Sequence, residues 1–170
     1  MGEVGGGWEV VIATLMGERQ ALGQSDETPP IEVAERLEVL IRASVGLSAE
    51  RRAVLRDAVV RVRIVAEVLD LTGERLGDEA RQRGSPGAEG SIAKLLKGAM
   101  LRLATDIAGE ILGPAMVAET GIWGTTAWAR AAVLSAGLRI GGGTDEIQRN
   151  TLAERVLGLP REARPGPGTS

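Results

Sequence analysis

The sequence predicts an all-α fold in which several helices form an up-and-down bundle. Apolar residues recur at spacings of three and four along most of the chain, and no segment has the alternating pattern of a strand ladder. The segments between the predicted helices are of modest length, which favours antiparallel neighbours. With 170 residues, of which 44% are hydrophobic and 25% charged, the chain is long enough to bury the core of one domain.

Glycine, proline and capping residues define the ends of the predicted helices. Pro30 supplies a fixed φ at a helix start, Ser48 and Thr144 are candidate N-caps, and the Gly84–Gly87 segment is the clearest break. The helices are expected over about residues 7–23, 30–45, Ser48 to 82, 89–113, 125–138 and Thr144 to 157.

The longest predicted helix has one apolar stripe at spacings of three and four, which predicts the face turned to the core. Its members are Val54, Ala58, Val62, Val65 and Leu69. In the last predicted helix, Asp145 and Glu146 occupy the first turn, where the helix dipole favours acidic side chains.

The composition excludes several classes of function. A net charge of −3 gives no reason to expect nucleic acid or an anionic membrane as a partner. The chain contains no Cys, His or Tyr, which removes thiolate sites, the commonest metal ligand and the commonest general base. We therefore expect no metal site, and proton transfer near neutral pH falls to a carboxylate, with Lys second.

No targeting or membrane segment is expected. The first ten residues have neither a basic region nor an apolar run of the kind found in signal peptides. The least polar region, about residues 111–138, is interrupted by proline, glycine and charged residues, so it does not resemble a membrane span. We expect a cytoplasmic protein.

The segment 141–160, GGGTDEIQRNTLAERVLGLP, resembles the signature that ends the acyl-CoA dehydrogenase domain. In that family a Gly-Thr opens a helix beside the flavin, and a run ending in Ile-Gln-Arg follows. Residues 5–20 resemble the junction at which the β-domain of the family passes into its C-terminal helices, and residues 84–96 resemble a loop and helix start of bacterial members. The resemblance covers essentially the whole chain.

The resemblance implies a domain organisation. Residues 7–160 would form a bundle like the C-terminal domain of acyl-CoA dehydrogenases, and residues 1–6 would be a remnant of the interdomain junction. The composition of the last residues, RPGPGTS, predicts in addition a disordered tail over residues 161–170. The family also has an N-terminal helical domain and a central β-domain, so we expect this chain to correspond to the last third of such an enzyme.

The resemblance also implies a reaction. In the family, a carboxylate removes the α-proton of an acyl-CoA while the β-hydride passes to FAD. The carboxylate either directly precedes the Gly-Thr or belongs to a Glu-Arg pair on the first helix of this domain. Gly142 occupies the first place, and Glu18-Arg19 matches the second.

A helical wheel agrees with Glu18 as the base. Trp8, Val11, Leu15 and Leu22 define an apolar arc, and Glu18 falls beside Val11 on that arc. Burial there would raise the pKa of the carboxyl towards neutral pH. The alternative from the wheel alone is a structural ion pair formed by Glu18 and Arg19.

The cofactor-binding residues implied by the resemblance are Gly143, Thr144, Glu146 and Arg83. Thr144 has a structural role as a helix cap and, by the matched signature, a second role in flavin contact. Arg83 stands near the helix from which family members reach the flavin pyrophosphate of a neighbouring subunit; a solvated charge is its alternative.

Two functions follow. The first is the C-terminal domain of an FAD-dependent acyl-CoA dehydrogenase that acts with an electron-transferring flavoprotein and is inactive alone. The second is a non-catalytic helical assembly module, associating with itself or with a full-length relative. A truncated gene with no independent role is a third possibility.

Overall fold

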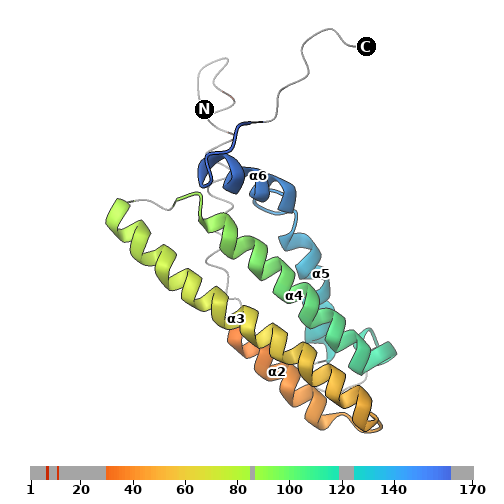
Figure 1. The fold of residues 1–170 in the computed structure, drawn as a ribbon. Helices are drawn as coiled ribbons and strands as arrows, with labels where there is room; N and C mark the ends of the chain where they lie inside the picture. The colour runs from red at the N-terminus through yellow and green to blue at the C-terminus, as the bar shows by residue number, and fades with distance from the viewer. Residues whose placement is uncertain (1–6, 8–10, 12–29, 85–86, 119–124, 162–170) are drawn as a thin grey trace.

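The computed structural model describes Gly7, Val11 and residues 30–84, 87–118 and 125–161. Within these ranges the protein consists of α-helices and one short 3₁₀ helix, with no strand, so the predicted all-α fold is confirmed (Figure 1). The elements are α2 (Pro30–Ala43), α3 (Ala49–Arg83), α4 (Gly90–Leu112), η1 (Gly113–Met116), α5 (Thr125–Leu138) and α6 (Asp145–Arg155). The predicted helix over about residues 7–23 lies outside the described residues, apart from Gly7 and Val11.

The capping predictions for the long helix are confirmed. Ser48 accepts a hydrogen bond from the backbone N–H of Arg51 at 3.1 Å, which satisfies one of the free donors at the start of α3. Gly84 ends the helix with φ 76°, in the left-handed region that glycine adopts most easily. At the far end of α4, Gly113 stops the helix as predicted, and the 3₁₀ turn η1 follows.

The predicted core face of α3 was partly wrong. Val62 and Leu69 are buried as expected, but Val54 is 60% exposed. The buried residues of this helix are Leu55, Val59, Val62, Ala66 and Leu69. Apolar residues at spacings of three and four can be followed along α3 from Val54 or from its neighbour Leu55, so the sequence allows two adjacent apolar stripes. Packing against α2 and α4 selects the stripe that contains Leu55.

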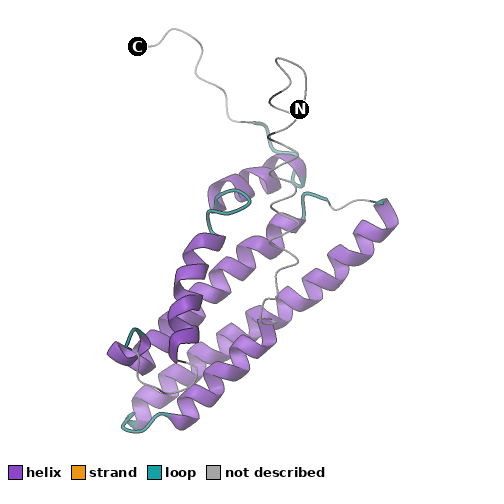
Figure 2. Cartoon of the chain, turned by 180° about the vertical axis from the view of Figure 1, so that it is seen from behind, coloured by secondary structure: helices purple, strands orange, loops and turns teal. Residues whose placement is uncertain are grey.

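Helix α4 is the centre of the described fold. It contacts α2 and α3 on one side and α5, α6 and η1 on the other. Helices α2, α3, α4 and α5 run alternately up and down, and α6 crosses near the start of α4 (Figures 1 and 2). Small residues such as Gly98, Ala104 and Ala108 are buried on α4, which lets its neighbours approach closely.

The core lies between α2, α3 and α4. Its largest fully buried side chains are Leu37, Leu55, Met100 and Val62, and Trp128 of α5 packs against the same cluster from the other side. None of the described helices is long and apolar enough to cross a membrane.

Candidate functional site

A glycine turn joins α5 to α6 and gives the start of α6 its geometry. Gly142 and Gly143 have φ values of 66° and 104°, a backbone conformation that L-residues with side chains rarely adopt. A Cβ atom on Gly143 would lie 3.0 Å from Nε2 of Gln148 and 3.3 Å from Cγ2 of Ile147. The sequence therefore needs glycine at position 143 for both its conformation and its space.

Thr144 is the N-cap of α6, as the sequence predicted. Its hydroxyl accepts a hydrogen bond from the backbone N–H of Ile147 at 3.4 Å. The pKa of Glu146, in the first turn, is lowered first by its own backbone N–H and then by the Thr144 hydroxyl. Both side chains are exposed, so this helix start presents a hydroxyl and a charged carboxylate on the surface.

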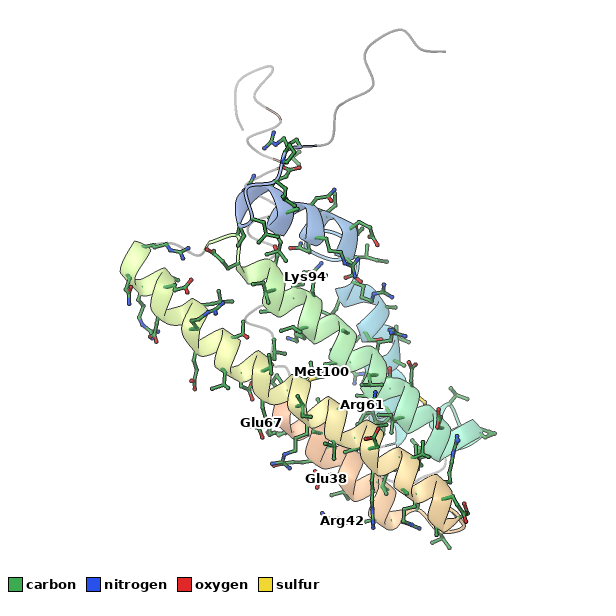
Figure 3. All side chains as sticks on the ribbon, in the orientation of Figure 1. Glu38, Arg42, Arg61, Glu67, Lys94 and Met100 are labelled. Atoms are coloured by element: carbon green, nitrogen blue, oxygen red, sulfur yellow. The ribbon has the colours of Figure 1, made fainter. Side chains whose placement is uncertain are left out.

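Two side chains hold the carbonyl groups of the glycine turn. The buried amide of Gln148, which is 3% exposed, donates from Nε2 to the carbonyl oxygen of Gly142 at 2.8 Å. The ammonium of Lys94 donates to the carbonyl oxygen of Gly143. Lys94 comes from α4, and Figure 3 places it at the end of that helix nearest α6. The turn is thus fixed from two different helices.

An ion pair fixes the other side of the turn. Arg139 donates from Nε to Oδ2 of Asp145 at 2.7 Å, and the Asp145 side chain is only 13% exposed. A Cβ built on Gly98 would lie 3.4 Å from Cγ of Arg139, so glycine leaves room for the arginine stem to cross α4. Lys97, one turn along α4 from Lys94, is part-buried, and burial lowers its pKa.

Arg83 is engaged elsewhere. It ends α3 and pairs with Glu79 at 2.9 Å and with Glu89 at 3.2 Å. The hydrogen bond to Glu89 raises the pKa of the guanidinium and lowers that of the carboxyl. Among the described elements α6 packs only against α4, so Arg83 and Thr144 are not brought together in one cluster. A flavin role for Arg83 stays a prediction.

Glu18, the predicted base, lies outside the described residues, as do Arg19 and most of the wheel that placed it on an apolar face. Its role stays a prediction. Across the described part of the chain, no group of three or more acidic residues is placed to hold a metal ion.

Sequence reasoning missed the residues that support the turn. Gln148 lies inside the Ile-Gln-Arg run that carries the family resemblance, and one turn of helix separates it from Thr144. Lys94 is one of only two lysines in a chain rich in arginine, a signal that could have singled it out. The approach of α4 to the turn could not be predicted from the sequence, because tertiary packing alone determines it.

Comparisons with known proteins agree with this arrangement. Residues 5–157 match a family model described as acyl-CoA dehydrogenase, C-terminal domain. The chain therefore belongs to the acyl-CoA dehydrogenase family and represents its C-terminal helical domain.

Individual relatives extend over nearly the whole chain. The acyl-CoA dehydrogenase IpdE1 of Mycobacterium tuberculosis is 34% identical over 171 residues, which cover 96% of this chain and 41% of the relative. IpdE1 of Mycolicibacterium smegmatis is 33% identical over 167 residues, covering 96% and 40%. The chain thus spans about two fifths of the length of these relatives.

A solved structure shares the fold. The crystal structure of the ChsE4–ChsE5 complex from Mycobacterium tuberculosis superimposes with a TM-score of 0.67 at 26% sequence identity. The match covers 95% of this chain and 42% of the solved one.

Proposed function

We propose that this chain is the flavin-facing C-terminal domain of an FAD-dependent acyl-CoA dehydrogenase, which introduces an α,β double bond into an acyl-CoA thioester. Membership of the family supports the reaction class. The observation that carries the proposal is the exposed start of α6, where a glycine turn is followed by Thr144 and Glu146.

The residues at this helix start fit the uncharged portions of FAD better than its diphosphate. Asp145 and Glu146 both lie in the first turn, where they already complement the positive end of the helix dipole. Two carboxylates there disfavour the diphosphate of FAD. An uncharged portion of the cofactor, such as the ring system or the ribityl chain, is compatible with a bare glycine backbone and a threonine hydroxyl.

Gly143, Thr144 and Glu146 are therefore the proposed contacts to FAD. Gly143 offers backbone without a side chain, and the Thr144 hydroxyl is a donor and acceptor at the surface. Arg83 is the proposed contact to the diphosphate bound by a neighbouring subunit. It would have to share its guanidinium with Glu79 and Glu89 to make this contact.

Bound FAD supplies the two-electron acceptor for the β-hydride. In the proposed reaction, the carboxylate of Glu18 takes the α-proton of the acyl-CoA. To remove this proton near neutral pH, the carboxyl group needs a raised pKa, which requires a position that excludes water. Gly142 cannot take the role, because it carries no acid where some family members have one.

We expect little or no dehydrogenase activity from the 170-residue chain alone. The relatives are more than twice as long, and this chain covers about two fifths of each. The missing domains would have to come from a longer protein or from a full-length relative. The proposed partners are a second copy of this chain or a full-length relative, and an electron-transferring flavoprotein.

The test is co-expression with candidate partners that carry the missing domains, followed by a flavin spectrum and an acyl-CoA reduction assay. Glu18→Gln should retain bound flavin but abolish its reduction by acyl-CoA. Glu9→Gln is the matched control, since Glu9 falls on the opposite face of the predicted wheel and should keep full activity. Full reduction in Glu18→Gln would remove Glu18 as the base, and absence of flavin from every complex would contradict the proposed function itself.

The second candidate function is a non-catalytic assembly module. The observation that favours it is the apolar surface left exposed on α3, where several large aliphatic side chains are about half exposed. A complex that never binds flavin but forms a stable oligomer would favour this reading over the enzyme.

A further inference from the structure

Lys94 brings a positive charge close to the proposed flavin contact. Its ammonium group donates to the carbonyl oxygen of Gly143, the residue directly before the Thr144 cap. Figure 3 shows Lys94 at the end of α4 that lies nearest α6. A flavin ring in contact with the Thr144 hydroxyl would therefore lie within about 10 Å of this ammonium group.

The charge of Lys94 lies on the inner side of the central helix. Lys94 is separated by four, eleven and fourteen residues from Gly98, Thr105 and Ala108, spacings that place all four on one face of α4. The other three residues are buried, and Lys94 itself is part-buried. Because protein surrounds this ammonium group on part of its surface, solvent and salt screen its field less than that of an exposed charge.

Two carboxylates at the same helix start carry the opposite charge. Asp145 is held by Arg139 at 2.7 Å, so the fields of these two groups largely cancel at a distance. The Glu146 side chain is 73% exposed and pairs with Arg149 at 3.8 Å, so water and Arg149 weaken its field. We therefore expect the ammonium group of Lys94 to have the larger effect at the turn.

A flavin ring changes its charge when it is reduced by a hydride. The oxidised ring is neutral, and uptake of a hydride adds one negative charge to it. A nearby cation stabilises the charged form more than the neutral form, and charges beside the ring are one means by which proteins adjust the electronic properties of a flavin. A cation close to the ring therefore raises its reduction potential.

We propose that Lys94 is a tuning residue, whose ammonium group stabilises the reduced flavin and so favours hydride transfer from the acyl-CoA. The effect rests on the proposed function, since it needs a flavin at the start of α6. It is distinct from the hydrogen bond to Gly143, because it belongs to the charge and not to the geometry of the turn. At about 10 Å and an effective dielectric constant of about 20, the equilibrium constant for reduction changes about tenfold, which is about 30 mV for two electrons.

The experiment measures the midpoint potential of flavin in the complex of this chain with a partner that carries the missing domains. The flavin is equilibrated with a reference dye, and both absorption spectra are recorded. Lys94→Arg keeps the charge and a donor, Lys94→Gln keeps only a donor, and Lys94→Met removes both. Lys94→Arg should keep the potential of the unchanged chain, whereas Lys94→Gln and Lys94→Met should both lower it by about 30 mV.

Two further measurements separate the charge from the geometry of the turn. Hydrogen exchange at the amides of residues 143–148 reports how well each variant holds the turn. The Gln and Met variants should differ in exchange but share one potential. Arg102→Gln is the matched control on α4, since Arg102 is exposed, pairs with Asp106 and lies about 12 Å further along the helix. Its potential should not change.

Three outcomes would overturn the proposal: an unchanged potential in Lys94→Gln, a potential in Lys94→Arg as low as that in Lys94→Gln, or potentials that follow hydrogen exchange rather than charge. An equal fall in Arg102→Gln would also contradict it, because the effect would then not depend on the position of Lys94. Flavin bound at an unchanged potential would remove this role of Lys94 and leave the proposed function standing. Complexes without any flavin would contradict the proposed function itself.

Discussion

The ammonium group of Lys94 donates a hydrogen bond to the carbonyl oxygen of Gly143, which ties the central helix α4 to the turn that opens α6. The amide of Gln148 holds the preceding carbonyl, that of Gly142, at 2.8 Å. The position of the Thr144 cap therefore depends on contacts from two helices, and not only on the preferences of its own segment. In the proposed enzyme these contacts would set where flavin meets the domain.

Lys94→Met should loosen this turn. The substitution keeps much of the apolar stem but removes the donor, which leaves the carbonyl of Gly143 without this partner. We expect the free energy of unfolding to fall by about 1–2 kcal/mol. Hydrogen exchange at the amides of residues 143–148 should become faster, as measured by mass spectrometry or NMR.

The control for Lys94 is Arg102→Met, also on α4. Arg102 forms an exposed ion pair with Asp106 at 3.6 Å, a kind of pair that adds little to stability. Its loss should leave exchange in the turn unchanged. Equal effects of the two variants would show that Lys94 does not hold the turn.

Gly143→Ala should destabilise the protein by about 1–2 kcal/mol, because φ is 104° and the new Cβ would crowd Gln148 and Ile147. Thermal or urea unfolding measures the change. Gly73→Ala is the matched control: nothing lies within 4 Å of a Cβ there, and the position is inside α3. That variant should gain about 0.5–1 kcal/mol. The same sign for both variants would contradict the argument.

Local signals allowed most of the helical layout to be predicted. Ser48, Thr144, Gly84 and Gly113 act at helix ends through their own backbone and side chain, so their effect can be recognised without knowledge of the fold. The face that α3 buries was less certain, because Val54 and Leu55 belong to two stripes of similar spacing. Contacts with α2 and α4 decide between them, and such contacts are not local.

The candidate site was predictable to a similar extent. Thr144 and Glu146 could be identified from the order of residues in one segment. The support from Lys94 could not, since 49 residues separate it from Gly143 and their approach depends on how α4 packs. The ion pairs of Arg83 also depend on the local path of the chain, because Glu89 follows the break after α3.

Leu37→Ala should cost about 2–5 kcal/mol, because Leu37 is fully buried between α2 and its neighbours and the substitution leaves a cavity. Val39→Ala, two residues along α2, removes a side chain that is 63% exposed and should change stability by less than about 0.5 kcal/mol. Urea unfolding of the two variants compares them directly. A small effect at Leu37 would mean that the core described between α2, α3 and α4 is wrong.

Thr144→Ala should lose the cap of α6, at a cost of about 1 kcal/mol. Thr151→Ala is the control within the same helix. The Thr151 hydroxyl donates to the carbonyl oxygen of Ile147 at 2.8 Å, a bond that competes with the helix ladder and adds little. Chemical denaturation should therefore separate the two variants, and in the flavin-bound complex only Thr144→Ala should weaken cofactor binding.

The carboxyl of Glu146 should titrate below its ordinary pKa of 4.5, because its own backbone N–H and the Thr144 hydroxyl stabilise the charged form. A lowered pKa in the folded state means that this stabilisation is complete above the ordinary value and is lost as the pH falls through the folded value. Glu50 has the same arrangement at the start of α3, with its own N–H and Ser48, and its pKa is lowered too.

NMR titration of the side-chain carboxyl carbons can follow both residues in one sample. Thr144→Ala should move the Glu146 pKa back towards 4.5 and leave that of Glu50 unchanged. A Glu146 pKa that does not respond would exclude the hydroxyl as a cause, and a parallel change at Glu50 would indicate general unfolding rather than loss of one cap.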